Sequence, residues 1–332
     1  MEILINNTIP TDQWKELEAC SLTASYFQAK SCYDFYNSLN FAQGFVYAVK
    51  NDGKLKALVC GYIMADGGTL KQLFSKRAII PGGVMMHPEC SAKELALLLT
   101  ATRKELKSKA IYTEMRNYFD YSTYKTVFEQ NGFAYKAHLN FHVATPTVDL
   151  ALKNLSSTKR RDVKLSLKEG ASITDTKSQA DWDAYFELLN NLYSSKIKTP
   201  LFPKSFFDQL VHQPEAHLFA IHFNGELIGG SLCVELKDRI LYEWFVCGKD
   251  GQFKNIYPST LATWAAIAFA AEQNHSYFDM MGAGKPDEGY GVRDFKSKFG
   301  GELVEHGRFL SINNPLLYSI GKKTIEIIKK RK

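Results

Sequence analysis

The sequence FVYAVKNDGKLKALVCGY (residues 45–62) consists of two apolar segments joined by Asn-Asp-Gly, and LFAIHFNGELIGGSLCV (residues 218–234) repeats this arrangement with Asn-Gly. Asn-Gly and Asp-Gly tolerate the positive φ angles of tight hairpin turns, and the flanking segments have the composition of strands. Each stretch is therefore predicted to form a β-hairpin, and the second hairpin is a copy of the first.

The repeat continues beyond the hairpins. In the first half, a helical pattern at 92–109 runs into a strand at 110–115, and in the second half 258–273 runs into 276–281. Both halves then close with a helix, a glycine and a strand. The turn glycines Gly53 and Gly225 lie 172 residues apart, and the closing glycines Gly132 and Gly300 lie 168 apart. A nearly constant offset indicates a duplicated α/β unit.

Bulk properties place few limits on function. The 332 residues are 45% hydrophobic, enough for two domains with cores of their own. The N-terminus has no signal-peptide pattern, and no apolar run approaches the roughly 20 residues that span a bilayer. Six scattered cysteines indicate a reducing compartment, so a cytoplasmic location is expected. The net charge of +6 is modest and gives no reason to expect DNA as a partner.

The division between the halves is predicted near residue 148, after the turn signal Thr145-Pro146-Thr147. This gives an N-terminal domain at 1–148, which includes a strand at 137–143, and a C-terminal domain at 149–332. A polar helix is expected at 154–169, another at 181–193 and a loop at 194–203. From that helix pair onward the second half reads helix, helix, three strands, helix, strand, helix, strand, with mixed sheets.

That order resembles the GNAT acyltransferase fold, and six motifs resemble those of the Fem family of peptidoglycan bridge-forming aminoacyltransferases, which carry two tandem GNAT-like units. In chain order the motifs are Tyr26-Phe27-Gln28, Ile80-Pro81-Gly82-Gly83, the basic segment Ser157–Gly170, Tyr257-Pro258 with Trp264, Phe278-Asp279 with Gly282, and Phe295-Lys296-x-x-Phe299-Gly300-Gly301. The resemblance covers nearly the whole chain and implies an α/β protein built of two tandem GNAT-like domains.

The resemblance also implies catalytic residues. Amide formation passes through a tetrahedral oxyanion, and the lysine of the closing motif, here Lys296, is assigned to its stabilisation in family members. The alternative is a solvated lysine on an amphipathic helix. An attacking amine must lose a proton, for which Asp279 and Glu243 are candidates by their strand positions. No local motif pairs a Ser or Cys nucleophile with a His, so direct attack is expected.

The basic segment supplies candidate binding residues. Arg160 and Arg161, with Lys164, suit the phosphates of a nucleotide-linked or lipid-linked substrate, although the same charges could merely solvate a helix face. Tyr257 and Arg293 complete the predicted substrate-binding set.

The loop 251–259 has no Gly-x-Gly, and Pro258 removes a donor, which argues against the pyrophosphate contacts of an ordinary acetyl-CoA enzyme. Lys254 is the candidate there for contact with a donor phosphate. No tightly bound cofactor is expected. The acyl donor is a cosubstrate, either an aminoacyl-tRNA or an acyl-CoA or acyl carrier protein.

The acceptor implied by the resemblance is an amine on a small or lipid-linked envelope precursor. Bridge-forming members place an acidic residue after the Pro-x-Gly-Pro strand, but here Gly83-Val-Met-Met-His87 contains no carboxylate. A degenerate, non-catalytic module that binds an envelope precursor or RNA is the alternative. His212, His217 and His222 have the wrong spacing for a metal site, and none is predicted.

The C-terminal segment combines apolar and basic residues. The apolar set is Pro315–Ile320 with Ile325, Ile327 and Ile328, and the basic set is Lys322, Lys323, Lys329, Lys330, Arg331 and Lys332. Such a segment can rest on an anionic membrane surface, or it can be a helix packed on its own domain with a solvated end. Both interpretations remain open from the sequence.

Overall fold

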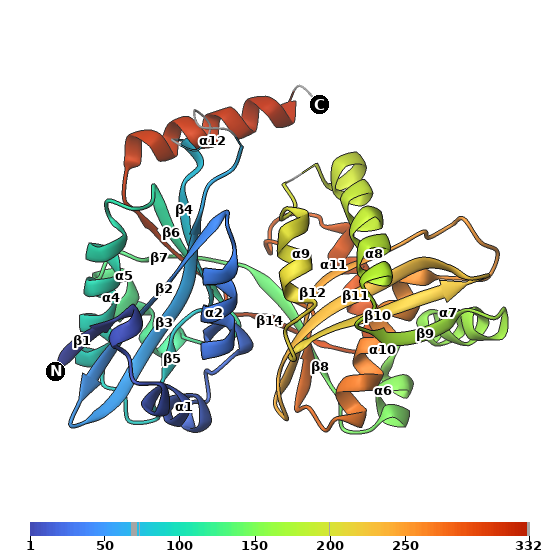
Figure 1. Cartoon of the computed structure of the whole chain (residues 1–332), viewed down its shortest axis with the longest axis horizontal. Helices are drawn as coiled ribbons and strands as arrows, with labels where there is room; N and C mark the ends of the chain where they lie inside the picture. Colours follow the sequence, from blue (N-terminus) through green and yellow to red (C-terminus); the bar gives the residue numbers. More distant parts are fainter. Residues whose placement is uncertain (68–71, 73, 199, 331–332) are drawn as a thin grey trace. The chain divides into compact units, whose positions relative to one another are not determined.

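The computed structural model describes residues 1–67, 72, 74–198 and 200–330, without the side chains of 324–330. The contacts divide the chain into two units (Figure 1). Unit 1 comprises residues 1–137 and 306–332, and unit 2 comprises residues 138–305. Each unit is built on one mixed sheet, so the predicted α/β class with two tandem domains is confirmed.

The sheet of unit 1 is antiparallel except where β4 runs parallel to β6. Its strands, in spatial order, are β1 (Glu2–Ile5), β2 (Ala42–Asn51), β3 (Lys54–Met64), β4 (Arg77–Gly82), β6 (Tyr112–Asn117), β15 (Arg308–Ile312) and β7 (Ala134–Lys136), with β5 (Met85–Met86) beside β3. Its helices are α1 (Thr11–Cys20), α2 (Lys30–Ser38), α4 (Ala92–Leu106), α5 (Lys125–Gln130) and α12 (Pro315–Lys330), with short 3-10 turns η1 (Asn6–Thr8), η2 (Tyr26–Gln28) and η3 (Ser122–Tyr124).

The sheet of unit 2 has one parallel pair, β12 with β13. Its strands, in spatial order, are β9 (Ser172–Thr176), β10 (Ala216–Phe223), β11 (Glu226–Leu236), β12 (Ile240–Gly248), β13 (Tyr277–Asp279), β8 (Leu139–Ala144) and β14 (Glu302–Glu305). Its helices are α6 (Val148–Asn154), α7 (Ser157–Lys168), α8 (Gln179–Leu192), α9 (Lys204–Leu210), α10 (Pro258–Glu272) and α11 (Gly291–Lys296), with the π-helical turn η4 (Tyr193–Ile197) and the 3-10 turn η5 (Ser297–Phe299).

The two predicted hairpins are confirmed as β2–β3 and β10–β11. Asp52 and Gly53 have φ angles of 51° and 78°, and Asn224 and Gly225 have 50° and 78°. Two consecutive positive φ angles define the tight turn that matches the twist of a hairpin. Both hairpins also carry a register irregularity near the turn, between Val49 and Lys50 in one and between Ile221 and His222 in the other. The duplication therefore extends to backbone detail.

The last strands of the two halves are exchanged. β8 follows β7 directly in sequence, but β8 pairs with β13 and β14 in the sheet of unit 2. Conversely, β15 follows β14 but pairs with β6 and β7 in the sheet of unit 1. With this exchange the two sheets have the same order of seven strands. Each sheet is thus completed by a strand that belongs, by its place in the repeat, to the other half of the chain.

The exchange moves the domain boundary. Residue 148 was predicted to separate the halves, but the division falls between Ala137 and His138, and residues 306–332 return to unit 1. The predicted strand at 137–143 is β8 and belongs to unit 2 rather than to the first half. The reason is strand pairing, because β8 finds hydrogen-bond partners only in the second sheet among the described residues. The edge strands β1 and β9 were not predicted from the sequence.

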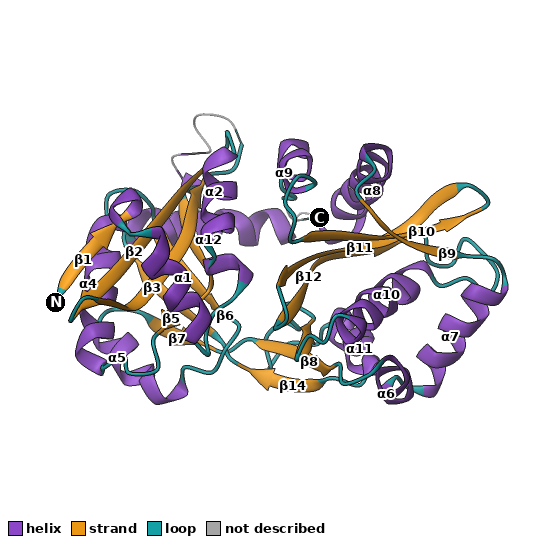
Figure 2. Ribbon diagram, turned by 60° about the horizontal axis from the view of Figure 1, so that its bottom comes forward, coloured by secondary structure: helices purple, strands orange, loops and turns teal. Residues whose placement is uncertain are grey.

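Helix α10 illustrates how the core of unit 2 is built. It packs on the strands of the sheet on one side and on α6 and α7 on the other (Figure 2). Its sequence, PSTLATWAAIAFAAE, is accordingly apolar nearly all round, as expected for a helix covered on both sides. Helix α4, its counterpart in unit 1, has an apolar face toward the sheet and a charged outer face with Lys93, Arg103 and Lys104.

The C-terminal segment forms α12, in which Tyr318 packs edge-on against Tyr112 with ring centroids 5.4 Å apart. Leu316 and Ile320 are exposed. The predicted contributions of Ile325, Ile327, Ile328, Lys329, Lys330, Arg331 and Lys332 lie outside the described side chains. Among the described residues, no helix is both long and apolar enough to cross a bilayer.

Candidate functional site

The sheet of unit 2 opens between its two parallel strands. β12 pairs with β13 only at Ile240, Leu241 and Tyr242, and its remaining residues run on with no partner in β13. In unit 1, by contrast, all six residues of β4 pair with β6. The carboxyl ends of parallel strands are a common place for ligand sites in α/β sheets, and only the second sheet is split there.

A β-bulge lies at the start of this opening. The register of β11 with β12 pairs Cys233 with Glu243 and Leu232 with Phe245, which leaves Trp244 as the extra residue. The rings of Trp244 and Phe245 are stacked at 6.0 Å, so these two neighbours lie on one face of the strand. Bulges re-aim side chains and are frequent beside active sites. Here the bulge follows immediately after Glu243.

Glu243 is a buried carboxylate at this position, with 3% of its surface exposed. Its Oε1 accepts hydrogen bonds from Ser231 Oγ at 3.1 Å and from Thr263 Oγ1 at 2.8 Å. Its Oε2 has no hydrogen-bond partner among the described residues. Burial raises the pKa of Glu243, and the positive charge of Lys296 opposes this. One oxygen of this carboxylate is therefore available to accept a proton.

Lys296 enters the site from the end of α11 and is also buried. Its ammonium donates hydrogen bonds to the carbonyl oxygens of Met280 and, at 2.9 Å, Gly282. Positive φ angles at Met281 (52°) and Gly282 (98°) belong to the turn that carries both carbonyls. Burial lowers the pKa of Lys296, while the charges of Glu243 and Asp279 raise it. Lys296 is thus not a solvated surface lysine, and it lies within the field of both predicted carboxylates.

Asp279 ends β13 and is completely buried. Its Oδ1 accepts hydrogen bonds from Asn140 Nδ2 and from the backbone N–H of Met281, both at 2.7 Å. Its Oδ2 lies 3.3 Å from Nε2 of His142. The imidazole of His142 stacks on Tyr277 with centroids 4.4 Å apart and keeps 17% of its side chain exposed. A buried carboxylate thus orients a partly exposed histidine.

Asn140 and His142 were not predicted as site residues, because their strand was expected to belong to the first half. A signal was present, since these polar residues alternate with Leu139, Phe141 and Val143, the pattern of a strand with one polar face. The polar face becomes part of the site only because β8 joins the second sheet.

The predicted phosphate-binding residues of α7 are Arg160, Arg161 and Lys164, and they differ in what their side chains contact. Arg160 donates to the carbonyl oxygens of Lys153 and Leu155 at the end of α6. Arg161 is exposed and pairs with Asp162 at 3.0 Å, and Lys164 is exposed. The Arg160 side chain therefore links α7 to the end of α6.

Lys159, the buried cation of the same helix, was not predicted as a site residue. Its ammonium donates to Thr260 Oγ1 at 2.6 Å and lies 4.1 Å from the ring centroid of Phe295. Burial lowers the pKa of Lys159, and the charges of Asp162 and Asp250 oppose this. These contacts fasten α7 to α10 and α11 rather than presenting a charge to solvent.

The remaining predicted residues are Tyr257, Arg293 and Lys254. Tyr257 precedes α10, and its N–H donates to Ser166 Oγ at 3.0 Å. The pKa of Arg161 is raised mainly by Asp162, and the Tyr257 side chain adds to this effect. Arg293 donates to the carbonyl oxygens of Ala283 and Lys285, which holds the loop before α11. Lys254 is exposed on the loop before α10. The structure therefore brings together Lys296, Asp279 and Glu243, and it also brings Tyr257 to Arg161. The side chains of Arg160 and Arg293 are engaged by backbone carbonyls instead.

The N-terminus of α10 is occupied by a carboxylate of the chain itself. Asp250 accepts hydrogen bonds from the N–H of Ser259 at 3.2 Å and from its hydroxyl at 2.5 Å. Helix N-termini attract anions, and the N-terminus of α10 already binds the Asp250 carboxylate.

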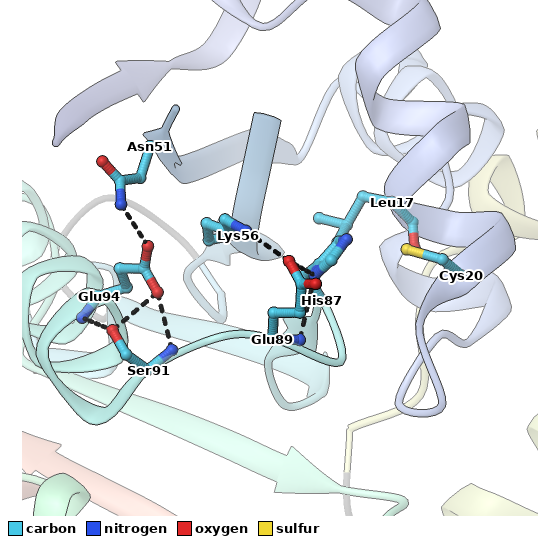
Figure 3. Close-up of polar contacts among 8 residues, drawn as sticks. All are labelled: Leu17, Cys20, Asn51, Lys56, His87, Glu89, Ser91 and Glu94. Atoms are coloured by element: carbon cyan, nitrogen blue, oxygen red, sulfur yellow. Dashed lines mark hydrogen bonds and ion pairs between the residues drawn. The ribbon is translucent and has the colours of Figure 1, made fainter. Parts of the chain in front are cut away.

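The corresponding helix of unit 1, α4, is capped in a different way but also internally (Figure 3). Oε2 of Glu94 accepts from the N–H and hydroxyl of Ser91 at 2.7 Å each, and Asn51 donates to Oε1 at 2.9 Å. In the same view Lys56 is paired with Glu89 at 3.1 Å. In both units, side chains of the chain itself thus accept hydrogen bonds from backbone N–H groups at the start of this helix.

Comparison with known proteins agrees with this architecture. Residues 153–297, which lie within unit 2, match the family model described as an acetyltransferase (GNAT) domain. No curated protein matches the chain by sequence.

Among the described residues, no group of three or more His, Cys, Asp or Glu side chains is arranged to hold a metal ion.

Solved structures match nearly the whole chain. FemX superposes with a TM-score of 0.72 at 15% identity, covering 96% of this chain and 99% of FemX. L-PGS from Bacillus licheniformis gives 0.58 at 12% identity, with 96% of each chain covered. A tandem GNAT protein from the clavulanic acid biosynthesis pathway gives 0.58 at 11% identity, covering 95% of this chain and 99% of that one. The chain thus has the tandem GNAT fold, and the predicted likeness to Fem-type proteins is confirmed for the fold.

Proposed function

We propose that unit 2 transfers an acyl or aminoacyl group to an amine by direct attack, without a covalent enzyme intermediate. The observation that carries the proposal is the opening between β12 and β13, which has Glu243, Asp279 and Lys296 around its closed end. Acyl transfer to an amine needs a proton acceptor and a group that stabilises the tetrahedral oxyanion. This arrangement offers both.

In this proposal His142 is the base and Asp279 is its positioning residue. His142 is the most exposed of the candidate proton acceptors, and its Nε2 lies 3.3 Å from Oδ2 of Asp279, so a buried carboxylate stands behind the ring as in other His–Asp pairs. Glu243, with its unpartnered Oε2, is the second candidate. Two N–H groups of the Lys296 ammonium bind carbonyls, and the third is proposed to face the oxyanion.

The proposed donor is an aminoacyl-tRNA rather than an acyl-CoA. A CoA pyrophosphate bound in the GNAT manner would need the N-terminus of α10, where Asp250 already occupies the N–H and hydroxyl of Ser259. A second anion there would be repelled by the first. The resemblance to Fem-type aminoacyltransferases supports the same choice, and an amine of an envelope precursor is the proposed acceptor.

The donor proposal is tested with CoA and the variant Asp250→Asn, which removes the charge and keeps a hydrogen-bonding side chain. We expect no thermal shift of the wild type with millimolar CoA and a measurable shift of the variant. Equal stabilisation of both forms by CoA would contradict the role given to Asp250.

The activity is tested by offering aminoacyl-tRNA, acetyl-CoA and acyl carrier protein separately, with a panel of amines, and detecting the amide by mass spectrometry. His142→Ala and Asp279→Asn are each expected to lower kcat by about 10²–10⁴-fold. His212→Ala, at an exposed histidine of the same unit, is the matched control and should retain full activity. A trapped acyl-enzyme would exclude direct attack, and no product from any donor would favour the non-catalytic binding module.

A further inference from the structure

The repeat leaves one surface of unit 1 open that is covered in unit 2. In unit 2, α6 follows β8 and packs on α10 together with α7. The closing glycine, Gly300, lies directly beneath α6, since a Cβ there would come within 2.4 Å of the carbonyl oxygen of Asn154. In unit 1 the helix that follows the exchanged strand is α12, and no helix equivalent to α7 exists among the described residues.

A cavity of 440 Å³ lies at the matching place in unit 1, between the last turns of α4, the end of α5 and the end of β15. Its lining includes Arg103 and Lys104 from α4 and Lys107, which directly follows α4, and no aspartate or glutamate. None of these three cations forms an ion pair among the described residues. Glu105, the acidic residue of the same helical turn, pairs with Lys109 instead.

Cations near a helix C-terminus are common because they offset the helix dipole. Two details go beyond that explanation. A Cβ at Gly132, which has a φ of 82°, would come within 2.7 Å of the Arg103 guanidinium, so the glycine leaves room for this side chain. Asn313, at the far wall, donates to the carbonyls of Leu106 and Ala110, yet its buried Oδ1 has no hydrogen bond among the described residues.

We propose that this cavity, named here the α4 pocket, binds a small ligand that carries two adjacent phosphate groups. Three unpaired positive charges call for a ligand with at least two negative charges, and the guanidinium fork of Arg103 matches phosphate oxygens. The volume is within the range of small-molecule sites. The α4 pocket belongs to unit 1 and does not depend on the proposed transferase activity.

The test is isothermal titration calorimetry of the full chain with inorganic pyrophosphate and, separately, with a nucleoside diphosphate. Arg103→Ala combined with Lys107→Ala is expected to weaken binding of both at least tenfold. The matched control is Lys15→Ala with Lys93→Ala, which removes the same charge from exposed positions of the same unit. This control should bind within twofold of the wild type, and circular dichroism checks that both variants are folded.

A further variant separates geometry from charge. Arg103→Lys keeps the positive charge but loses the planar fork, and we expect severalfold weaker binding of pyrophosphate. Absence of binding by the wild type, or equal weakening by the control pair, would overturn the proposal. Binding of an RNA oligonucleotide that neither pyrophosphate nor the nucleoside diphosphate displaces would overturn it as well, because the pocket would then be part of a nucleic-acid surface.

Discussion

At the scale of single residues, a charged network on the sheet of unit 2 is the clearest source of pH-dependent stability. Glu235 lies between His217, at 3.4 Å, and His275, at 2.9 Å, and His217 also pairs with Asp175 at 2.9 Å. Burial raises the pKa of Glu235, but hydrogen bonds from the two histidines outweigh this and lower it to about 2. Burial lowers the pKa of His217, but bonds to Asp175 and Glu235 raise it to about 9.

These shifts set the pH window of the stabilisation. The contribution of Glu235 is present above its unfolded pKa of about 4.3 and is lost as the pH falls toward 2. The contribution of His217 is full below its unfolded pKa of about 6.5 and is lost as the pH rises through 9. The network therefore stabilises most between about pH 4.5 and 6.5.

We predict that Glu235→Gln lowers the free energy of unfolding by about 2–4 kcal/mol at pH 5.5 and by clearly less at pH 9.5. The reason is that His217 is charged below its pKa of about 9 and then loses its carboxylate partner, whereas above this pKa it is neutral. Urea denaturation at both pH values measures this. Glu226→Gln is the control, since Glu226 forms an exposed pair with Lys249. An equal loss at both pH values would contradict the assignment.

A second residue-scale prediction concerns Tyr121, which fixes the chain reversal after β4. Its buried hydroxyl oxygen accepts a hydrogen bond from the N–H of Val84 at 3.0 Å. The same hydroxyl lies within hydrogen-bond distance of the carbonyl oxygens of Gly82 and Val84. Both Gly82 and Gly83 have positive φ, so the turn is strained for other residues. Tyr121→Phe should destabilise the protein by about 1–3 kcal/mol, because a buried N–H loses its partner.

Thermal and urea unfolding measure this loss. Tyr124→Phe, at a less buried tyrosine three residues later, is the control and should have little effect. A neutral Tyr121→Phe would show that water replaces the hydroxyl.

At the scale of elements, the exchanged strands make each unit depend on a distant segment. Phe309 of β15 is 1% exposed and stacks on Phe128 of α5 with centroids 4.0 Å apart. β15 also supplies the only strand pairing between β6 and β7 among the described residues. The core of unit 1 is therefore incomplete until the last strand has been made.

We predict that a chain ending at Glu305 retains protected amides in unit 2 but loses protection in β6 and β7. Phe309→Ala in the full chain should cost about 3–5 kcal/mol by opening a cavity in the same place. Hydrogen exchange measured by mass spectrometry reads both units at once. Unchanged protection of β6 in the shortened chain would contradict the structural role of β15.

At the scale of the whole molecule, the contact of the C-terminal segment with a membrane stays a prediction. The full chain is expected to pellet with anionic vesicles, since basic residues near such a surface contribute about 1 kcal/mol each. Deletion of residues 321–332 should abolish this pelleting, and neutral vesicles serve as the control. If both forms pellet equally, or if neither pellets, residues 321–332 have no role in membrane contact. The described contact of α12 is then the packing of Tyr318 on Tyr112.

The sequence by itself determined the features that depend on neighbouring residues. The Asp52-Gly53 and Asn224-Gly225 turns have the predicted positive φ angles, because turn conformation is set by the few residues within it. The periodic patterns of α4 and α10 were recognised for the same reason, and the offset between the copies was enough to predict the duplicated fold.

Only the tertiary structure decided which segments meet. The alternating pattern that puts Asn140 and His142 on one face of a strand was visible in the sequence. The sheet that this strand joins was not predictable, because pairing between strands more than a hundred residues apart leaves no local signal. The same holds for Arg160, whose charge pointed to phosphate until the end of α6 supplied its partners. Lys296 was predicted from a motif. Its burial beside Glu243 and Asp279, which shifts its pKa, could be learned only from the folded chain.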